Sequence, residues 1–302
     1  MTGHTPDTSP RSDSALVLAG GGVAGIAWML GMIDGLRRRD VDLAAADLIV
    51  GTSAGACVGA AVATGALEQA VERQRSADTS EIVVPFDAAT YFATVTRLEA
   101  DAPDPRTGLL QIANMDPLGA TVSQAERRAV IAARLPVHDW PRKRLLVTAI
   151  DAQDGELVTF DRESGVDLVD AVTASCALPG VWPAATLDGR RYVDGGIRSP
   201  THADLAAGHD FVVIVVPIPL TDSFRERLAR ETASLSSSDI HVIAAGEALL
   251  AAIGPNAMDP ARRGVALDAG LEQAEREIDA LADRWARANM RATAPTANDD
   301  DV

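Results

Sequence analysis

The chain has 302 residues, which is enough for one large α/β domain with a sizeable core. Its 43 acidic and 27 basic side chains give a formal net charge of −16, which argues against nucleic acid or a strongly anionic membrane surface as an electrostatically bound partner. Aromatic residues make up 4% of the chain, too few to favour the base-stacking surfaces of single-strand-binding proteins. The apolar fraction of 47% excludes wholesale disorder.

The two ends of the chain are polar. Residues 1–14 lack the basic stretch and apolar run of a signal peptide, so we predict a disordered tail there and an acidic disordered tail over residues 291–302. Residues 15–290 are expected to form one domain. Cys57 and Cys176 are too few for a disulfide framework or a four-thiolate zinc site, and they indicate buried thiols in a cytoplasmic, reducing compartment.

The first predicted elements alternate between strand and helix. An apolar run over residues 15–19 precedes a glycine turn and a helix over 25–39, and a second run over 47–50 precedes another glycine turn and an alanine-rich helix. Residues 15–33 and 48–67 lack charge over nearly the length of a membrane span, but internal glycines and small polar residues break them, so no transmembrane segment is predicted. This βαβα order predicts an α/β fold with a parallel sheet.

The remaining elements follow the same pattern. Residues 76–124 are more polar and are predicted to be an irregular or lid-like insert. Strands are expected over 144–150 with a hairpin partner at 156–161, over 211–216 and over 241–243, and helices over 167–175 and 260–287. Residues 187–193 are expected to form two short strands around an Asp188–Gly189 turn.

Gly51-Thr-Ser-Ala-Gly55 matches G-x-S-x-G between the second strand and its helix. In such a turn a strained serine is held at the N-terminus of a helix, where the helix dipole stabilises a developing anion. Ser53 is therefore the candidate nucleophile, with Gly51 and Gly55 as the flanking glycines. The alternative is that Ser53 only caps a tight turn.

Gly20-Gly-Gly-Val-Ala-Gly25 matches G-x-G-x-x-G between the first strand and its helix. Its backbone N–H groups can converge on a pyrophosphate or on the oxyanion of an acyl-transfer intermediate. A dinucleotide site also needs an acidic residue at the end of the second strand. Asp40, Asp42 and Asp47 all precede that strand, so the dinucleotide interpretation lacks its second anchor.

Two hypotheses remain for the base that activates Ser53. Asp194, which ends a short strand and is followed by Gly195 and Gly196, can approach a serine without obstruction. A Ser–Asp–His triad can instead be fitted with Asp151 or Asp194 and one of three histidines: His202, His209 or His241. We expect most histidines to be surface groups and Asp151 to be structural or exposed to solvent.

Together these three motifs, with Ala174–Pro183 before the hairpin, resemble the patatin-like phospholipase family over about residues 15–220. The resemblance implies a three-layer α/β fold with a mainly parallel central sheet flanked by helices. It implies Ser53 as nucleophile and Asp194 as general base of a dyad, without metal or cofactor. It also implies an oxyanion hole in the glycine-rich motif, which comprises Gly20, Gly21, Gly22, Val23 and Gly25.

The resemblance further implies a serine lipid acyl hydrolase acting on lipid esters. Trp182, near the expected site, is a candidate substrate contact. Family members usually carry Arg or Lys where this chain has Ala24. The alternative function is a non-catalytic nucleotide- or lipid-binding protein that uses the Gly20–Gly25 loop. Given the net charge, we expect any peripheral membrane contact to be apolar and local, through the 76–124 insert.

Overall fold

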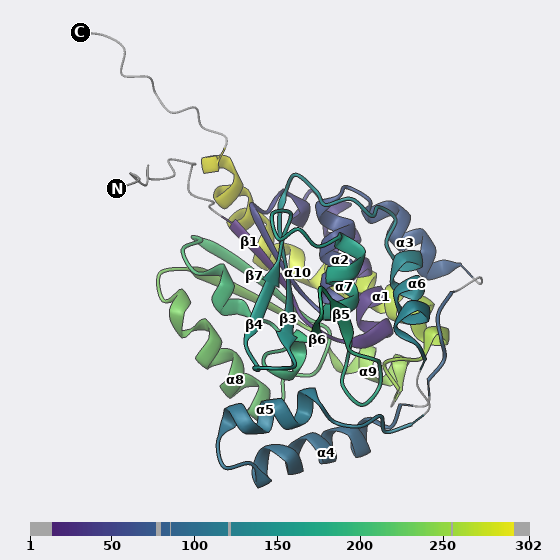
Figure 1. Cartoon of the computed structure of the whole chain (residues 1–302). Helices are drawn as coiled ribbons and strands as arrows, with labels where there is room; N and C mark the ends of the chain where they lie inside the picture. Colours follow the sequence, from purple (N-terminus) through teal and green to yellow (C-terminus); the bar gives the residue numbers. More distant parts are fainter. Residues whose placement is uncertain (1–13, 77–79, 85, 120–121, 255, 293–302) are drawn as a thin grey trace.

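A single mixed β-sheet organises the chain in the computed structural model, which describes residues 14–76, 80–84, 86–119, 122–254 and 256–292 (Figure 1). The strands are β1 (Ser14–Leu18), β2 (Leu48–Thr52), β3 (Arg144–Asp151), β4 (Leu157–Phe160), β5 (Ala185–Leu187), β6 (Arg190–Asp194), β7 (Phe211–Val216) and β8 (Asp239–Ala244). Their order is β5-β6-β3-β2-β1-β7-β8, with β4 also paired to β3. Strands β3, β2, β1, β7 and β8 run parallel, whereas β4 and β6 pair antiparallel with β3 and β5 pairs antiparallel with β6.

Ten α-helices lie in the described ranges. They are α1 (Gly22–Arg37), α2 (Ala54–Ala63), α3 (Leu67–Arg75), α4 (Ala88–Asp101), α5 (Pro105–Ala113), α6 (Gln124–Arg134), α7 (Leu168–Ser175), α8 (Asp222–Thr232), α9 (Glu247–Ile253) and α10 (Arg263–Ala292). Short 3-10 turns include η2 (Gly195–Ile197) and η3 (Ala203–Ala206).

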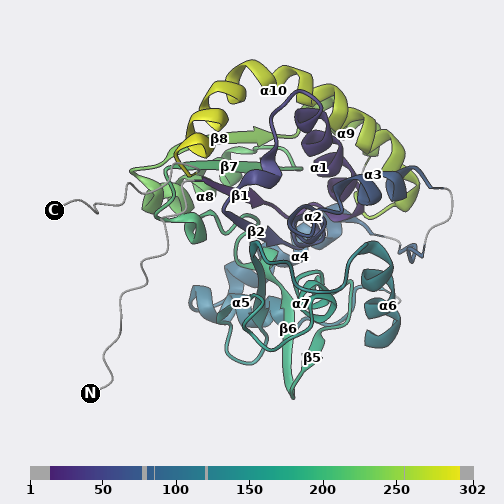
Figure 2. The same ribbon diagram turned by 90° about the horizontal axis from the view of Figure 1, so that it is seen from above.

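The sheet is covered on both faces, which gives three layers (Figure 2). Leu16 and Leu18 point into a core shared with α1, α2, α7 and α10. The alternate residues Ala15 and Val17 point into a second core that is closed by η3 and α8. Central strands buried on both faces must be apolar throughout, which is why the runs over β1 and β7 show no alternation of polar residues.

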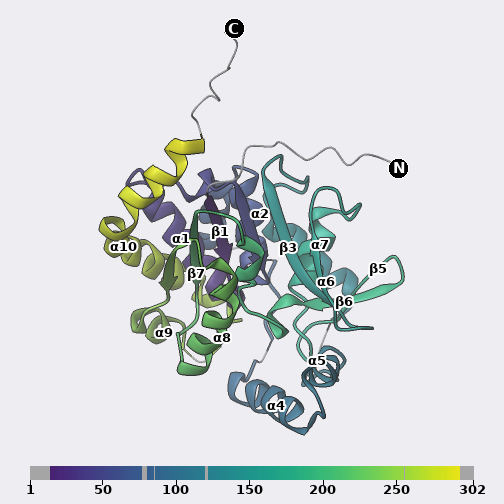
Figure 3. The ribbon, with the colours of Figure 1, turned by 90° about the vertical axis from the view of Figure 1, so that its left-hand side faces the viewer.

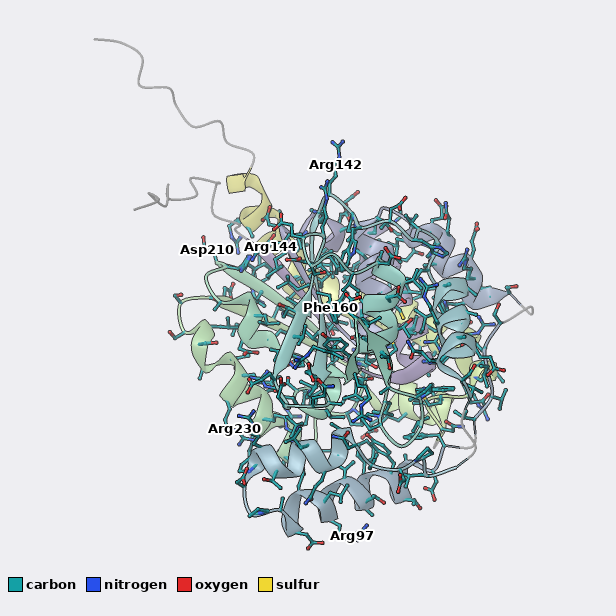
Figure 4. The ribbon with its side chains drawn as sticks, viewed as in Figure 1. Arg97, Arg142, Arg144, Phe160, Asp210 and Arg230 are labelled. Carbon is teal, nitrogen blue, oxygen red and sulfur yellow. The ribbon has the colours of Figure 1, made fainter. Side chains whose placement is uncertain are left out.

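Different residues lie at the two ends of the parallel strands, which form the amino edge and the carboxyl edge of the sheet. Arg142 and Arg144, at the start of β3, lie at one edge together with Asp210, which precedes β7 (Figure 4). Arg97 of α4 lies at the opposite edge, below the carboxyl ends of the strands (Figure 4). Helices α4 and α5 extend along this edge (Figure 3). In open α/β sheets ligands bind at the carboxyl edge.

Most expected elements are confirmed, with boundaries shifted by a few residues: the three-layer, mainly parallel sheet, the hairpin over Asp188–Gly189, the pairing of β4 with β3 and the long helix after 260. The expectation of an irregular 76–124 insert is wrong, because α4 and α5 fill much of it. Asp87 caps α4, and Asp104 followed by Pro105 starts α5, so local capping signals fix both helices.

The predicted tails, 1–14 and 291–302, lie almost wholly outside the described residues. Ser14 already begins β1, and α10 continues to Ala292, so the described structure passes both predicted boundaries by one or two residues. Within the described ranges, no helix combines the length and apolar character needed to cross a bilayer.

Candidate active site

Ser53 occupies a strained turn between β2 and α2. Its backbone has φ 54° and ψ −115°, in the left-handed half of φ space that side chains rarely adopt, and it directly precedes the first turn of α2. The Ser53 N–H donates to Ser175 Oγ at 2.9 Å, which holds the turn to the end of α7. At Gly55 a Cβ atom would collide with the Leu18 carbonyl, so glycine is required where α2 passes β1. The Ser53 side chain is half-buried and lies where the parallel strands end at their carboxyl ends.

Asp194 lies beside Ser53, at the end of β6. Its side chain lines the same pocket as that of Ser53, and its Oδ1 accepts the N–H of Gly196 at 2.8 Å. The residue is 2% exposed. Burial, opposed only in part by the Ser53 hydroxyl, the Gly196 N–H and the Arg127 charge, raises the pKa of Asp194 to about 6. A carboxylate with this pKa is a stronger base than an exposed one and is still ionised at neutral pH.

The glycine loop after β1 faces the same place. Gly20 donates its N–H to Pro200 and Ala24 donates to Ala257, at 3.0 and 2.9 Å. Gly21, Gly22 and Val23 lie between these two residues. Their N–H groups have no acceptor in the described part of the chain, as expected for the first turn of α1. Gly22 has φ +67°, and a Cβ there would lie 2.9 Å from the Ala257 oxygen. Gly25 is packed against Pro217, so its role in the loop is steric.

A small pocket connects these groups. It is lined by Gly22, Val23, Ile26, Ser53, Ala54, Arg127, Arg134, Cys176, Leu178, Trp182, Asp194 and Met258. The structure therefore brings Ser53, Asp194 and part of the glycine loop together, and Trp182 lines the same pocket as expected. Ala24 is fully buried, and the cations of the pocket come from α6 instead.

Two features of the pocket were not predicted. The guanidinium of Arg127 stacks on the Trp182 ring, with Cζ 3.8 Å from the ring centroid. Burial, together with the charge of Arg134, lowers the pKa of Arg127 to about 10, so the group remains a cation at neutral pH.

The second feature is the contact of Cys176 with the nucleophile turn. Cys176 Sγ lies 3.2 Å from the Ser53 carbonyl oxygen and 3.7 Å from Cys57 Sγ. Both thiols are free and buried, and their burial agrees with the prediction from the sequence.

The insert also reaches the site. Burial, followed by the nearby charge of Asp194, raises the pKa of Tyr91 on α4. Helix α5 packs against η2, the turn that contains Gly195 and Gly196. Tyr91 is in edge contact with Phe92, whose ring centroid lies 5.4 Å away. Helix α5 of the insert thus contacts the turn that follows Asp194, and Tyr91 of α4 lies within reach of the Asp194 charge.

The histidines do not form a triad. The expectation that they are mostly surface groups is wrong for His202 and His209, which are buried. His202 Nδ1 lies 3.1 Å from Thr52 Oγ1, and burial lowers the pKa of His202 to about 3, so its ring is neutral. Among the described residues no hydrogen bond joins a histidine to Ser53 or Asp194. Asp151 is buried and bound to Arg190, which confirms a structural role.

The sequence model of the patatin-like phospholipase family matches residues 16–207, a span that begins within β1, continues through β6 and contains the glycine loop, Ser53 and Asp194. This chain belongs to the patatin-like phospholipase family. Its patatin-like region includes the candidate nucleophile, the candidate base and the glycine-rich motif, whereas His209 and His241 lie outside it.

Relatives of this patatin-like chain include uncharacterized NTE family proteins of Mycobacterium bovis and of two Mycobacterium tuberculosis strains. Each is 31% identical over 193 residues, which is 64% of this chain and 44% of the relative. The chain therefore spans less than half the length of these relatives. Among solved structures, VipD from Legionella pneumophila is similar with a TM-score of 0.45 and 15% identity, over 90% of this chain and 68% of that one.

Proposed function

We propose that this chain hydrolyses carboxylic esters of lipids through an acyl-serine intermediate, with Ser53 as nucleophile and Asp194 as general base. The observation that carries the proposal is that Ser53, on a strained turn at the N-terminus of α2, lines one pocket with the buried carboxyl of Asp194. The raised pKa of Asp194 and membership of the patatin-like family support it further.

The reaction has two halves. Ser53 Oγ attacks the acyl carbonyl carbon while Asp194 accepts the hydroxyl proton, and the carbonyl oxygen becomes an oxyanion. The N–H groups of Gly21, Gly22 and Val23 stabilise this oxyanion, helped by the dipoles of α1 and α2. When the tetrahedral intermediate collapses, the C–O bond to the alcohol breaks and the alcohol takes the proton from Asp194. Asp194 then accepts a proton from water, whose oxygen attacks the acyl carbon. When this second tetrahedral intermediate collapses, the bond between the acyl carbon and Ser53 Oγ breaks, Ser53 takes the proton back from Asp194, and the fatty acid is released.

A fluorophosphonate with a lipid-like chain tests this proposal. We expect one covalent adduct per wild-type chain by intact mass, no adduct in Ser53→Ala and slower adduct formation in Asp194→Asn. Ser164→Ala, which removes an exposed serine far along the chain, is the matched control and should label like wild type. Absence of an adduct in wild type would contradict the hydrolase proposal and favour the non-catalytic nucleotide- or lipid-binding alternative. A dinucleotide titration then tests the Gly20–Gly25 loop.

We also propose that the 76–124 insert contacts the lipid surface that holds the substrate. Three of the four large apolar side chains that stand exposed in the described ranges lie in this insert: Val83 is 71% exposed, Phe92 62% and Leu118 48%. Helix α5 of the insert contacts the turn that follows Asp194, so a lipid surface bound by the insert would lie near the site. Because the net charge is −16, the attraction must come from apolar burial.

A further inference from the structure

The buried guanidinium of Arg127 has no hydrogen-bonded carboxylate among the described residues. The residue is 3% exposed, and its Nε and Nη1 atoms are buried and donate to no acceptor in that part of the chain. The ring of Trp182 covers one face of the guanidinium but accepts none of its N–H donors. An unpaired buried charge is strongly destabilising, and a bound anion relieves that penalty.

The other arginines of α6 show that this is a particular property of Arg127. Arg134 Nε and Nη2 each donate to one oxygen of Glu81 at 2.6 Å. Arg128 Nε donates to Asp170 at 2.6 Å, with 42% of its side chain exposed. Among the described residues, Arg127 is thus the one arginine of this helix that is not hydrogen-bonded to a carboxylate.

The position of Arg127 relates this charge to the reaction centre. Arg127 lines the same pocket as Ser53 and Asp194, and its charge acts on Asp194. Asp194 Oδ1, however, accepts the Gly196 N–H, and neither Nε nor Nη1 of Arg127 donates to Asp194. Stacking on Trp182 fixes the plane of the guanidinium, so its donors project from the edge. Two neighbouring N–H groups on one edge of a guanidinium can donate in parallel to two oxygens of a phosphate, and arginine commonly binds phosphate in this bidentate way.

We infer that Arg127 binds a phosphate group of the substrate and selects lipids in which a phosphate lies close to the scissile ester. The inference rests on the proposed function for the position of the ester, but the anion site itself needs no turnover. Arg127 is then a specificity-determining residue: it reads a group on the substrate, while Ser53 and Asp194 perform the bond changes.

Binding to the full chain carrying Ser53→Ala tests the inference without hydrolysis. The ligands are dihexanoyl phosphatidylcholine below its micelle-forming concentration, dihexanoylglycerol with the same acyl chains and no phosphate, and inorganic phosphate. We expect the phosphate lipid to bind roughly tenfold or more tightly than the neutral lipid, as a charge-assisted hydrogen-bonded pair contributes. Adding Arg127→Gln should remove this preference, and adding Arg127→Lys should leave about a third of it or less, because Lys keeps the charge without the paired donors.

Arg128→Gln is the matched control, because it removes the same charge from the same helix outside the pocket. It should leave the preference for the phosphate lipid unchanged. Equal binding of the two lipids to Ser53→Ala, or equal weakening of both by Arg127→Gln, would overturn the inference. Tight binding of inorganic phosphate with no gain from the acyl chains would also overturn it, since the ligand would then be free phosphate. A retained preference in a chain whose Ser53 forms no fluorophosphonate adduct would support the anion site while the proposed hydrolase activity fails.

Discussion

Asp194 lines the same pocket as Ser53, although the two residues come from distant parts of the patatin-like region and only 2% of Asp194 is exposed. Burial in this position works against ionisation, and its effect exceeds that of the Ser53 hydroxyl, the Gly196 N–H and the Arg127 charge together. The pKa of Asp194 is raised to about 6 as a result. Two measurable consequences follow, one for reactivity and one for stability.

The first prediction concerns the pH dependence of serine labelling. Only ionised Asp194 can accept the Ser53 proton, so the rate of fluorophosphonate labelling should rise with pH through about 6 and then level off. The rate is measured by intact mass at a series of pH values. Asp194→Asn should label slowly, with no step near pH 6. A step near pH 4 in wild type would contradict the raised pKa.

The second prediction concerns stability. Because the pKa of Asp194 is higher in the folded chain than the ordinary value of 3.8, the folded state holds this proton more tightly than the unfolded state. Asp194 therefore costs no stability below about pH 4, and its cost grows as the pH rises from about 4 to about 6. The total is about 3 kcal/mol above pH 6, at 1.36 kcal/mol per unit of pKa shift.

Asp194→Asn should remove this cost while keeping an oxygen for the Gly196 N–H. We expect the variant to exceed wild type in free energy of unfolding at pH 7.5, and the difference to shrink towards pH 4, measured by urea denaturation at both pH values. Asp210→Asn changes an exposed aspartate at the opposite edge of the sheet (Figure 4) and is the control, with no such pH-dependent gain. An equal gain at both pH values would contradict the explanation.

The third prediction tests the glycine loop. Gly22→Ala introduces strain at φ +67° and a methyl group 2.9 Å from the Ala257 oxygen, so the loop must shift and its N–H groups move away from Ser53. We expect labelling to slow by about a hundredfold or more, because loss of one oxyanion donor slows acyl transfer by roughly 100- to 1000-fold. Gly65→Ala has a similar φ of +73° but nothing within 4 Å of the new methyl. It should lose stability and keep its labelling rate; equal slowing in both variants would contradict an oxyanion role.

The sequence predicted the site better than its surroundings, for physical reasons. Ser53 and the glycine loop lie in short motifs directly after β1 and β2, and parallel strands bring their carboxyl ends to one edge. The pairing of Ser53 with Asp194 required the resemblance to a family, because the residues alone left the histidine triad open. Helix α5 of the insert was predictable from Asp104–Pro105, since these residues are an N-cap and a first-turn proline.

Arg127 had no signal of its own in the sequence. Its neighbours on α6 are charged, which is typical of a solvent-facing helix, and its burial depends on Trp182 from a distant segment. The same holds for His202, whose burial follows from its contact with Thr52 across the sheet edge. Such tertiary contacts leave no periodic pattern in the chain.

The fourth prediction concerns the lipid surface. Phe92 exposes 62% of its surface on the helix that carries Tyr91, beside the pocket. If this ring enters the membrane interface, Phe92→Ser should weaken binding to phosphatidylcholine vesicles several-fold, as expected from losing an apolar side chain of this size. Co-sedimentation with vesicles measures the change, and fluorophosphonate labelling in solution should remain as in wild type.

Val265→Ser is the matched control for this experiment. Val265 is 46% exposed but lies on α10, outside the insert, so its loss should leave vesicle binding unchanged. Binding through apolar contact should also persist as the salt concentration rises, because the chain carries a net charge of −16 and no electrostatic attraction is being screened. Equal losses in the two variants, or vesicle binding that disappears in high salt, would show that the chain reaches the membrane by another surface.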